Sequence, residues 1–549
     1  MEFLLALAQV DPHVGGLDKN LAMMLANAQQ AKDAGASLIV YPELVTTGYP
    51  PEDLLHKPVF LKRLVDAEQD FIRKLGEIEI DAVYGTIRQG SKGLLNAGVF
   101  IQDGKEVGFA AKWRLPNYGV FDEKRYFTQG VLVRTFAYKG CQFGITICED
   151  LWHTGGPLQE LAQSKTDFVL NLNASPYHLG KQSEREKMIS KRISESSLPI
   201  FYVNLVGGQD ELVFDGGSFV MSRDGVVLCR SPQFSPDISL VKIASSDDKP
   251  LEIFPGKVGE LYSPDKEIYS ALCLGLRDYV EKNGFAGVVL GLSGGIDSAL
   301  TAAICADALG PDRVEAVMMP SQYTSQDSLE DAKEGAVNIG IRLVNIPIDN
   351  IFSIFRNELA GEFSGLDEDV TEENIQPRIR ATLLMAISNK KGYLLVTTGN
   401  KSEVSVGYAT LYGDMAGGYS VLKDVLKERV FKLSSARNSW ATDAGEPLPI
   451  PLRVITKPPS AELKPDQKDS DSLPPYPVLD KILEMYVEKE RSLDEIVAHG
   501  IDREVVARVI SMVDRSEYKR RQAAPGVRIT PRAFGKDRRY PITNGFANS

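Results

Sequence analysis

The feature of this 549-residue sequence that most restricts its fold is a glycine-rich turn, SGGIDS, between an apolar run at 287–292 and a segment of helical composition that reaches residue 304. Two more strand-like segments, VEAVMMP and RLVNIPI, follow at intervals of about 25–30 residues, and YLLVTTGN adds another from Tyr393. Helical patterns separate them. Strands that alternate with helices in this way are typical of βαβ units, so we predict a parallel sheet in the second half of the chain.

The turn itself has the chemistry of a phosphate-binding loop. Gly294 and Gly295 allow a tight turn and a close approach of the backbone to an anion. A helix that begins here presents free N–H groups and the positive end of its dipole. Ser293 and Ser298 add hydroxyl donors, and the carboxylate of Asp297 suits Mg²⁺. These properties indicate binding of a phosphorylated ligand together with a magnesium ion.

Other motifs compete for the same turn. GxxxxGK[ST] does not fit, because no lysine follows the glycines, and GxGxxG fails on spacing. G-x-S-x-G does match residues 291–295, and its strand–turn–helix context also suits the nucleophilic serine of a hydrolase. The base would then be His499, the only histidine after residue 293. A hydrolase of this kind and a purely structural glycine turn both stay open as alternatives.

The first half of the chain alternates strands and helices in a pattern that predicts a layered α/β sandwich. Its expected strands are residues 3–10, 37–44, 82–88, 96–102, 105–113, 141–149, 168–174, 200–206 and 218–222, and its clearest helices are residues 17–34 and 183–196. The pattern changes at PGKVGELYSP, residues 255–264. We therefore expect a first domain at 1–255, a linker at 256–265 and a second domain at 266–549.

Two segments of the second domain have an unusual composition. Residues 457–477 contain six prolines, which exclude a regular helix or central strand and predict a loop or lid. Residues 515–539 hold nine basic residues and only two acidic ones. This basic C-terminal segment fits either a solvated tail or a set of groups, such as Lys519 and Arg520, that closes over phosphates.

The overall composition limits the classes of function. Sixty-two basic residues against 74 acidic ones give a net charge of −12, which disfavours a dedicated nucleic-acid-binding protein. No apolar run approaches the roughly 18–20 residues that cross a bilayer. The apolar start, MEFLLALAQVDP, has no basic residue ahead of it and no cleavage site. Five cysteines without CxxC spacing indicate neither a disulfide framework nor a zinc site, so we expect a cytoplasmic protein.

Three residues that can act together in nucleophilic catalysis stand near the ends of expected strands: Glu43, Lys112 and Cys148. A lone cysteine is usually a small buried hydrophobe. Strand ends, however, converge at one edge of a sheet, where α/β proteins place their sites. A thiol needs a base because the thiolate is the nucleophile, and Glu43 can supply one. Lys112 can stabilise both the thiolate and an oxyanion on an attacked carbonyl.

The strings around these residues resemble the nitrilase superfamily of carbon–nitrogen hydrolases: YPEL around Glu43, KWRLPNYGVFDEKRYF around Lys112 and ICEDLW around Cys148. The resemblance implies an αββα sandwich and a catalytic Glu–Lys–Cys triad, with Glu123 orienting the lysine. NASPYHLGK, residues 173–181, is similar to the glutamine-pocket segment of the amidotransferase branch. The glutamine-binding residues implied by this resemblance are Tyr118, Glu123, Ser175 and Lys181.

The second half resembles a different family. SGGIDS is similar to the pyrophosphate loop of the N-type ATP pyrophosphatases, which implies a Rossmann-like parallel sheet. ENIQPRIR, TTGNKSEVSVGYATLYGDMAGGYSVLKD and KPPSAELKPDQKD look like segments of NAD⁺ synthetases. With its nitrilase-like front half, nearly the whole chain resembles the glutamine-dependent NAD⁺ synthetases. One departure lies at SVLKD, because many single-domain members have a proline shortly before the aspartate that is Asp424 here.

The resemblance implies residues for each ligand of the second domain. The expected ATP contacts are Gly291, Ser293, Gly294, Gly295, Asp297, Ser298 and Thr398. The expected Mg²⁺ ligands are Asp297 and Glu403. The expected contacts of deamido-NAD⁺ are Arg378, Arg380, Asp414, Lys423 and Lys519, with Lys457 near the lid.

The reaction that the resemblance implies has two halves. A cysteine thioester forms on glutamine, ammonia leaves, and hydrolysis releases glutamate. ATP converts the nicotinate carboxylate of deamido-NAD⁺ into an AMP ester and pyrophosphate, and ammonia then displaces AMP to give NAD⁺. We expect a homo-oligomer, a dimer or larger, formed through the second domain. The alternatives are a stand-alone amidase, a non-catalytic ligand-binding homologue, and a synthetase that takes another acceptor.

Overall fold

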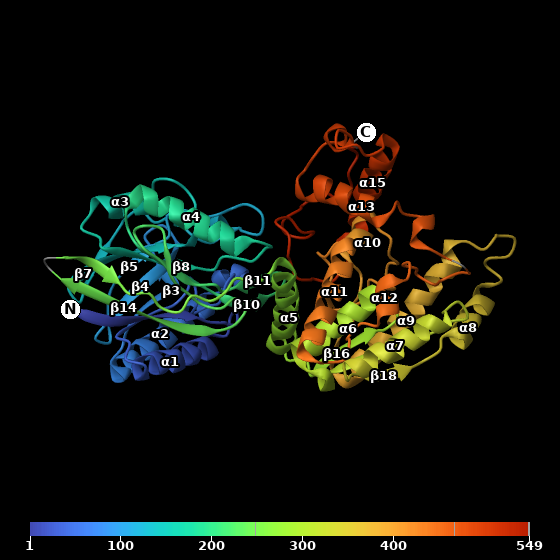
Figure 1. The fold of residues 1–549 in the computed structure, drawn as a ribbon, viewed down its shortest axis with the longest axis horizontal. Coiled ribbons are helices and arrows are strands. Elements are labelled where there is room, and N and C mark those ends of the chain that lie inside the picture. The colour runs from blue at the N-terminus through green and yellow to red at the C-terminus, as the bar shows by residue number, and fades with distance from the viewer. Residues whose placement is uncertain (247–248, 466, 547–549) are drawn as a thin grey trace. The chain divides into compact units, whose positions relative to one another are not determined.

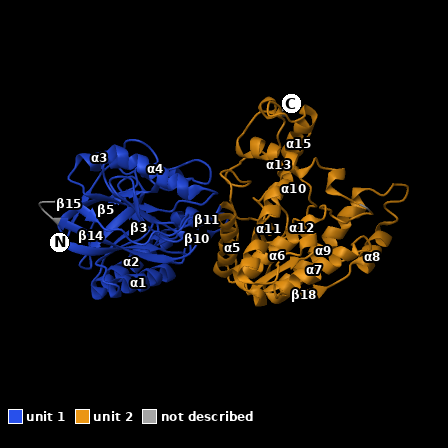
Figure 2. Ribbon diagram, in the orientation of Figure 1, with its two compact units in different colours: residues 1–263 blue, residues 264–549 orange. Residues whose placement is uncertain are grey.

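The computed structural model describes residues 1–246, 249–465 and 467–546. The chain divides into two compact units, Met1–Ser263 and Pro264–Ser549, which are blue and orange in Figure 2. Both units are of the α/β class that the sequence predicts. Among the described residues, no helix is long and apolar enough to cross a membrane.

Two large β-sheets form the centre of the first unit (Figure 1). The seven-stranded sheet has the order β15-β14-β1-β2-β3-β4-β5, and the six-stranded sheet has the order β13-β12-β9-β8-β7-β6. The first sheet contains β1 Glu2–Gln9, β2 Leu38–Val40, β3 Asp81–Gln89, β4 Leu94–Gln102, β5 Lys105–Ala111, β14 Asp237–Ser246 and β15 Lys249–Ile253. The second contains β6 Thr135–Tyr138, β7 Cys141–Ile147, β8 Phe168–Asn173, β9 Ile200–Asn204, β12 Phe219–Met221 and β13 Val227–Arg230. The strands β10 Val206–Gln209 and β11 Leu212–Asp215 form a separate pair.

Alternating residues explain how the two sheets stack. Leu5 and Leu7 of β1 share one buried cluster with Phe143 and Ile145 of β7, which places these side chains between the sheets. The outer face of the seven-stranded sheet packs against α1 (Leu17–Asp33) and α2 (Pro58–Ile78). The outer face of the six-stranded sheet packs against α3 (Pro157–Gln163) and α4 (Lys181–Ser196). This α-β-β-α layering confirms the predicted sandwich.

The helix α2 is absent from the elements expected from the sequence, although its pattern is strong. The buried side chains of Phe60, Leu64, Phe71 and Leu75 recur at helical spacing, and Pro58 stands in the first turn, where its missing N–H costs nothing. Period and start signal together would have identified this helix.

The three strands that lead to the predicted catalytic residues are shorter than the sequence suggests. The strand β2 ends at Val40, because Pro42 has no N–H with which to continue the ladder, and Glu43 lies on the turn beyond it. Lys112 follows the last residue of β5, and Cys148 follows the last residue of β7. All three residues therefore sit on turns at strand ends rather than within strands.

The second unit is built on five parallel strands in the order β18-β17-β16-β19-β20. They are β16 Gly287–Gly291, β17 Val314–Met318, β18 Arg342–Asn345, β19 Tyr393–Thr397 and β20 Tyr419–Ser420. The strand β16 pairs with β17 on one side and with β19 on the other, so the strand order reverses there. Ligands bind at such switch points in open α/β sheets. The predicted Rossmann-like parallel sheet is confirmed, and its glycine-rich turn follows β16.

Helices enclose this sheet. The helix α6 packs on β16 and β17, α5 and α11 pack on α6, and α9 packs on β16 and β19. The helices of the unit are α5 Pro264–Lys282, α6 Ile296–Leu309, α7 Gln326–Asn338, α8 Asp349–Leu359, α9 Val370–Lys391, α10 Lys401–Val406, α11 Lys427–Ala444, α12 Leu452–Thr456, α13 Tyr476–Leu483, α14 Leu493–Val497, α15 Arg503–Arg515 and α16 Glu517–Arg520. Short helices of other types are η1 Glu52–His56, η2 Glu123–Arg125, η3 Cys148–Leu151, η4 Pro311–Arg313, η5 Asp469–Asp471 and η6 Glu484–Glu488.

The basic C-terminal segment is folded onto the second unit. Arg520, Arg528 and Arg538 are buried, with exposed fractions of 6%, 9% and 4%. Arg520 and Arg538 bind Glu517, and Arg528 binds Asp537. The interpretation of this segment as a solvated tail is therefore wrong, because its cations pair with the few acidic residues around them.

The proline-rich stretch at 457–477 is mostly irregular, and its residue 466 lies outside the described residues. In its described residues, the elements are the short helix η5 and the first two residues of α13.

Gly98 of β4 provides a test of how closely the two sheets pack. A Cβ atom at this position would lie 2.6 Å from Cγ2 of Ile145 and 3.0 Å from Cδ1 of Leu172, both in the other sheet. We expect Gly98→Ala to lower the free energy of unfolding of the first unit by about 1–3 kcal/mol. Proteolysis of the first unit in increasing urea measures the shift.

Ser91→Ala is the control within the same unit, because Ser91 is exposed in the turn between β3 and β4. A urea midpoint for Gly98→Ala equal to that of the wild type would contradict the close packing of the sheets.

Candidate functional site

The first unit brings the predicted acidic and basic residues into direct contact. Nζ of Lys112 lies 2.7 Å from Oε1 of Glu43 and 2.7 Å from Oε1 of Glu123. Each of the three residues has an exposed fraction of 4% or less. A buried lysine held by two carboxylates is fixed in position, so its ammonium group has a defined direction.

Further hydrogen bonds orient the two carboxylates. Oε1 of Glu43 also accepts from Nδ2 of Asn96 at 2.7 Å, and its Oε2 accepts from the backbone N–H of Ala174 at 3.0 Å. The hydroxyl of Tyr49 donates to Oε1 of Glu123 at 2.9 Å. Because these donors come from different strands and turns, the fold itself holds the carboxylate of Glu43 in place.

Cys148 is the first residue of η3 and sits on the sharp turn that follows β7. Its φ angle is +41°, in the left-handed region that residues with a side chain rarely adopt. The neighbouring Asp150 secures this turn, since Oδ2 accepts from the N–H of Ile147 and Oδ1 accepts from the N–H groups of Trp113 and Arg114. The same carboxylate thus joins the cysteine turn to the segment that carries Lys112. Burial raises the pKa of Asp150 to about 6.

Charges around Cys148 determine its protonation. Burial raises the pKa of the thiol, the negative charge of Glu43 raises it further, and the positive charge of Lys112 opposes both effects. Burial alone would lower the pKa of Lys112, but Glu123 and Glu43 hold it well above its usual range. Burial raises the pKa of Glu123 to about 7. The site therefore favours a neutral thiol at Cys148 and a charged Lys112. The carboxylate of Glu43, whose charge acts on the thiol, is the group that can accept the thiol proton.

The expected glutamine-binding residues lie around the same turn but differ in exposure. Ser175 is buried, whereas 58% of Tyr118 is exposed and its hydroxyl donates to the carboxylate of Glu149 at 3.0 Å. Nζ of Lys181 lies 3.9 Å from the ring centroid of Trp152. The sequence analysis did not assign Glu149 or Trp152, although both stand in the ICEDLW string, within four residues of Cys148.

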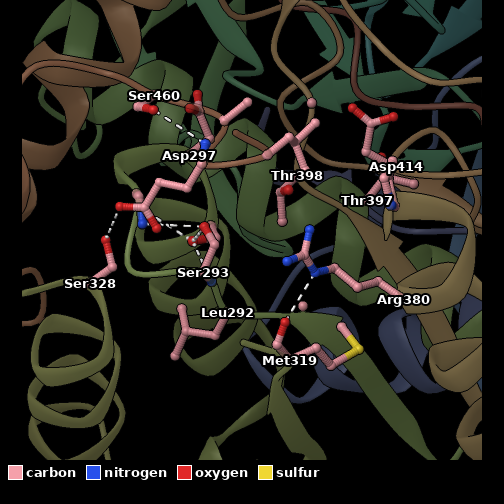
Figure 3. Close-up of a pocket in the computed structure, with 18 of the residues that line it drawn as sticks. Leu292, Ser293, Asp297, Met319, Ser328, Arg380, Thr397, Thr398, Asp414 and Ser460 are labelled. Atoms are coloured by element: carbon pink, nitrogen blue, oxygen red, sulfur yellow. Dashed lines mark hydrogen bonds between the residues drawn. The ribbon is translucent and has the colours of Figure 1, made fainter. Parts of the chain in front are cut away.

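The second unit contains a cavity of about 340 Å³ at the carboxyl ends of β16, β17 and β19. Figure 3 shows Ser293, Asp297, Thr398, Arg380 and Asp414 around it. Of the other residues expected to bind ATP, deamido-NAD⁺ or Mg²⁺, the following also line it: Gly291, Gly295, Ser298, Glu403 and Lys457. The cavity lies at the switch point of the sheet, where α/β proteins bind ligands.

The glycine-rich turn is held by its own serines. Oγ of Ser293 lies 3.1 Å from Oγ of Ser298 and accepts from the N–H of Gly295 at 3.2 Å. His499 is exposed and belongs to the loop after α14, so Ser293 pairs with a hydroxyl and an amide rather than with the histidine that a hydrolase would need. Gly294 has a φ of +79°, and a Cβ there would lie 2.2 Å from the carbonyl oxygen of Ser328. Gly294 therefore lets the turn pack closely against α7. It does not line the cavity.

The two expected metal ligands share a lysine that the sequence analysis missed. Nζ of Lys427 lies 2.5 Å from Oδ2 of Asp297 and 3.0 Å from Oε1 of Glu403. Nδ2 of Asn400 donates to Oδ1 of Asp297 at 2.9 Å. Burial raises the pKa of Glu403 to about 7. Lys427 is 130 residues from Asp297 in the sequence, and only the fold reveals that they are neighbours.

The oxygen donors of this group suit a magnesium ion. Mg²⁺ takes one or two protein carboxylates and keeps water or phosphate oxygens in its other positions. Asp297 and Glu403 provide two carboxylates that line the cavity. The described residues contain no cluster of three or more histidine, cysteine or acidic side chains that would form a complete protein cage. The donor set therefore fits a magnesium ion shared with a phosphorylated ligand.

Several other expected ligand contacts are engaged elsewhere. Nε of Arg380 donates to the carbonyl of Met319 at the cavity wall, as Figure 3 shows, but Nε of Arg378 donates to the carbonyl of Leu411. Nζ of Lys519 donates to the carbonyls of Gly407 and Ala409. Among the described residues, the cavity lining does not include Gly294, Arg378, Lys423 or Lys519.

The proline-rich stretch lies over the cavity. Glu462 accepts from the hydroxyls of Ser325 and Ser328 at 2.8 and 2.9 Å, at the start of α7. Nζ of Lys457 lies 3.0 Å from Oδ2 of Asp331 on the same helix. Residues 457–463 line the cavity, so this part of the stretch forms one of its walls.

Comparison with known families identifies both units. Residues 4–250 match the carbon-nitrogen hydrolase family, and residues 268–523 match the NAD synthase family. A protein of Acinetobacter baylyi, named glutamine-dependent NAD(+) synthetase, is 47% identical over 99% of both chains. A solved structure of the enzyme of that name from Acinetobacter baumannii, in complex with ADP, has a TM-score of 0.79 and 46% identity over 100% of both chains. A structure of the enzyme of that name from Cytophaga hutchinsonii, 22% identical over 99% of this chain and 98% of that one, shares the fold with a TM-score of 0.83.

The electrostatics of the first site generate a prediction for thiol reactivity. Glu43 disfavours the thiolate of Cys148, so Glu43→Gln removes a negative charge and lowers the pKa of the thiol. Because iodoacetamide reacts with the thiolate, we expect alkylation of Cys148 near pH 8 to become several-fold faster.

Mass spectrometry of the peptide that contains Cys148 measures this rate, and the buried Cys141 in the same samples serves as the reference. An alkylation rate that is unchanged or slower in Glu43→Gln would contradict the prediction that the charge of Glu43 disfavours the thiolate.

Proposed function

This chain belongs to the glutamine-dependent NAD⁺ synthetases, and on that basis we propose how its two units divide the reaction. The enzyme amidates deamido-NAD⁺ to NAD⁺, with glutamine as nitrogen donor and ATP as activator. The first unit releases ammonia from glutamine and the second consumes it. The observation that carries this division is that each unit holds its own buried lysine between two carboxylates, one beside Cys148 and one at the glycine-rich turn.

In the first unit Glu43 accepts the thiol proton of Cys148, and the sulfur attacks the carbonyl carbon of the glutamine side chain. Lys112 faces the oxyanion that forms and stabilises it. The C–N bond breaks, the proton leaves with the nitrogen as ammonia, and a γ-glutamyl thioester remains. Water, with its proton taken by Glu43, hydrolyses the thioester to glutamate and restores the thiol.

The residues around the cysteine turn hold the substrate. Tyr118, Ser175 and Lys181 bind glutamine, and Glu123 orients Lys112 through the contact described above. Because Glu149 accepts from Tyr118, it sets the direction of the exposed tyrosine at the edge of the site.

In the second unit the glycine-rich turn binds the phosphates of ATP. The nicotinate carboxylate of deamido-NAD⁺ attacks the α-phosphorus, the bond to pyrophosphate breaks, and an AMP ester forms. Ammonia attacks the ester carbonyl and AMP leaves. This activation is necessary because a carboxylate has no adequate leaving group at neutral pH. The groups at the carboxyl end of the sheet, Ser293, Ser298 and Thr398, face ATP, while Arg380 and Asp414 face deamido-NAD⁺.

Arg378, Lys423 and Lys519 remain proposed contacts of deamido-NAD⁺ outside the cavity lining. Their side chains would have to exchange a present partner for the substrate, as Lys519 would exchange the carbonyls of Gly407 and Ala409.

Asp297 and Glu403 would hold a magnesium ion, which when bound neutralises charge on the phosphates of ATP. Lys427 keeps the two carboxylates together and contributes a positive charge of its own next to the phosphate site. Asn400 orients Asp297 from the opposite side. Asp297 and Glu403 thus place their carboxylate oxygens in the part of the cavity that the glycine-rich turn lines, where the phosphates of ATP bind.

The segment 457–463 acts as a lid for this cavity. Its attachment through Glu462 to the serines at the start of α7 consists of a few hydrogen bonds, which can break and re-form as substrates enter and products leave.

Two properties of the whole molecule are part of the proposal. The enzyme is a homo-oligomer that associates through the second unit, and the exposed apolar side chains of Ile354 and Phe355 on α8 support an interface there. Light scattering that gives the mass of a single chain would contradict it. The enzyme works in the cytoplasm, where its five free cysteines stay reduced.

Cys148→Ala tests the division of labour. The substitution removes the nucleophile but leaves the second unit intact, so we expect NAD⁺ formation from glutamine to disappear while formation from an added ammonium salt persists. Both rates are measured by the appearance of NAD⁺ with Mg·ATP and deamido-NAD⁺.

Cys141→Ala is the control, because Cys141 is buried at the far end of β7 and has no part in the reaction. If Cys148→Ala abolishes both reactions while the protein stays folded, the proposed division is wrong.

Lys427→Met tests the second site. Loss of the ammonium group removes the contact that joins Asp297 to Glu403 and a positive charge beside the phosphates of ATP, so we expect NAD⁺ formation from either nitrogen source to fall by about a hundredfold or more. Hydrolysis of glutamine in the absence of ATP is expected to persist, because Lys427 belongs to the second unit and the glutamine site is built from residues of the first.

Lys432→Met, a change of an exposed lysine on the same helix, serves as the matched control. Ammonium-supported synthesis at the wild-type rate in Lys427→Met would remove this lysine from the mechanism.

A further inference from the structure

An ion pair that the mechanism above does not use lies buried in the first unit. Arg185 on α4 and Asp215 at the end of β11 both have an exposed fraction of 0%. Two nitrogens of the guanidinium bind the two carboxylate oxygens at 2.9 and 2.7 Å. Such a pair is costly to desolvate and is by itself weak evidence for a contribution to stability. Its remaining contacts show what else it does.

Every N–H group of Arg185 has an acceptor. Besides the two bonds to Asp215, Nη1 donates to Oε1 of Gln182 at 3.2 Å. Nη2 donates to the carbonyl of Ser175 at 2.8 Å, and Nε donates to Oγ of the same serine at 3.2 Å. Two of the five donors of this planar group thus fix the carbonyl and the hydroxyl of Ser175, while the other three bind Asp215 and Gln182.

Ser175 is next to the residue that holds the general base. The N–H of Ala174 donates to Oε2 of Glu43 at 3.0 Å, and the N–H of Ser175 donates to Oδ1 of Asn204 at 2.9 Å. A shift of the chain at 174–175 would therefore move two groups together: the hydroxyl assigned to glutamine and the amide that orients Glu43. The guanidinium of Arg185 restrains residues 174–175 through its two hydrogen bonds to Ser175.

The other side of the pair is also fixed. Asp215 is followed by Gly216 and Gly217, with φ angles of +66° and +62°. A Cβ at Gly217 would lie 2.4 Å from Oε1 of Gln182, so the turn packs directly on the helix that carries Arg185. Nε2 of Gln182 also donates to the carbonyl of Gly217 at 3.0 Å. The carboxylate of Asp215 therefore binds the guanidinium of Arg185 from a turn that is packed closely against α4.

We propose that Arg185, braced by Asp215, is a positioning residue for glutamine hydrolysis. It acts through residues 174 and 175, and it sets both the substrate contact of Ser175 and the orientation of Glu43. The proposal rests on the function assigned to the first unit. It explains why this position holds an arginine: a lysine can pair with Asp215, but one ammonium group cannot also reach the carbonyl and the hydroxyl of Ser175 in the geometry of the fork.

Arg185→Lys in the full-length enzyme tests this. The charge pair with Asp215 is retained and the fork is lost. We expect kcat for glutamine hydrolysis to fall by about tenfold or more, and KM for glutamine to rise, because a small misplacement of a catalytic group has effects of this size. NAD⁺ formation from an ammonium salt is expected to stay within about twofold of the wild type, since the second unit is unchanged.

The matched control is Arg192→Lys. Arg192 is also a buried arginine on α4 and pairs with Glu195, away from residues 174 and 175. We expect it to leave kcat and KM for glutamine unchanged. A residue that merely balances the charge of Asp215 would be replaced by lysine without loss, so wild-type kcat and KM in Arg185→Lys would overturn the proposal. Equal losses in the two variants would overturn it as well.

A second variant covers the case in which Arg185→Lys unfolds the first unit, which proteolysis reports. Asp215→Asn keeps the shape of the partner and an oxygen that accepts from Arg185, so we expect the same pattern of lower kcat and higher KM with a smaller size. If this variant also unfolds, or if it hydrolyses glutamine as the wild type does, the pair is structural and the proposal fails. Failure of the assigned function is seen separately, in Cys148→Ala.

Discussion

The chemistry of this enzyme depends on a lysine ammonium group buried between two carboxylates. Lys112 is held by Glu43 and Glu123 with almost no exposure to water. Removal of one partner from such a buried group costs about 3–5 kcal/mol, because a charge would remain unpaired. The arrangement therefore keeps the lysine charged and aimed while Glu43 retains a free oxygen lone pair for the proton of Cys148. The turns after β2, β5 and β7 supply Glu43, Lys112 and Cys148.

The second unit also contains a buried lysine between two carboxylates. Lys427 lies between Asp297 and Glu403 at the phosphate end of the cavity. A third lysine, Lys401, has no exposure and binds Asp424 at 2.7 Å and Glu488 at 2.7 Å. Because Asp424 also accepts from the N–H groups of Ile529 and Thr530, Lys401 ties the helix α10, which carries Glu403, to the C-terminal segment. Asp424, the last residue of SVLKD, is therefore a structural anchor.

Much of this could be predicted from the sequence, and the limits have physical causes. The sandwich, the parallel sheet and the glycine-rich turn follow from local period and spacing, which the sequence displays directly. Glu43, Lys112 and Cys148 stand in recognisable strings, and the structure brings them together. Lys427 and Arg185 were missed because their significance comes from partners 130 and 10 or more residues away, which only tertiary packing brings into contact. The interpretation of the basic C-terminal segment as a solvated tail was wrong because charge composition does not reveal that Arg520 and Arg538 are buried and paired with Glu517.

The account makes one claim that a single measurement addresses directly: nitrogen freed at the cysteine of the first unit becomes the amide nitrogen formed in the second. Glutamine labelled with ¹⁵N only in its side-chain amide is supplied with Mg·ATP and deamido-NAD⁺, and the NAD⁺ is examined by mass spectrometry. The account predicts one ¹⁵N atom in the carboxamide of the product for each glutamate released. Unlabelled NAD⁺, or glutamate released without NAD⁺ while all substrates are present, would contradict it.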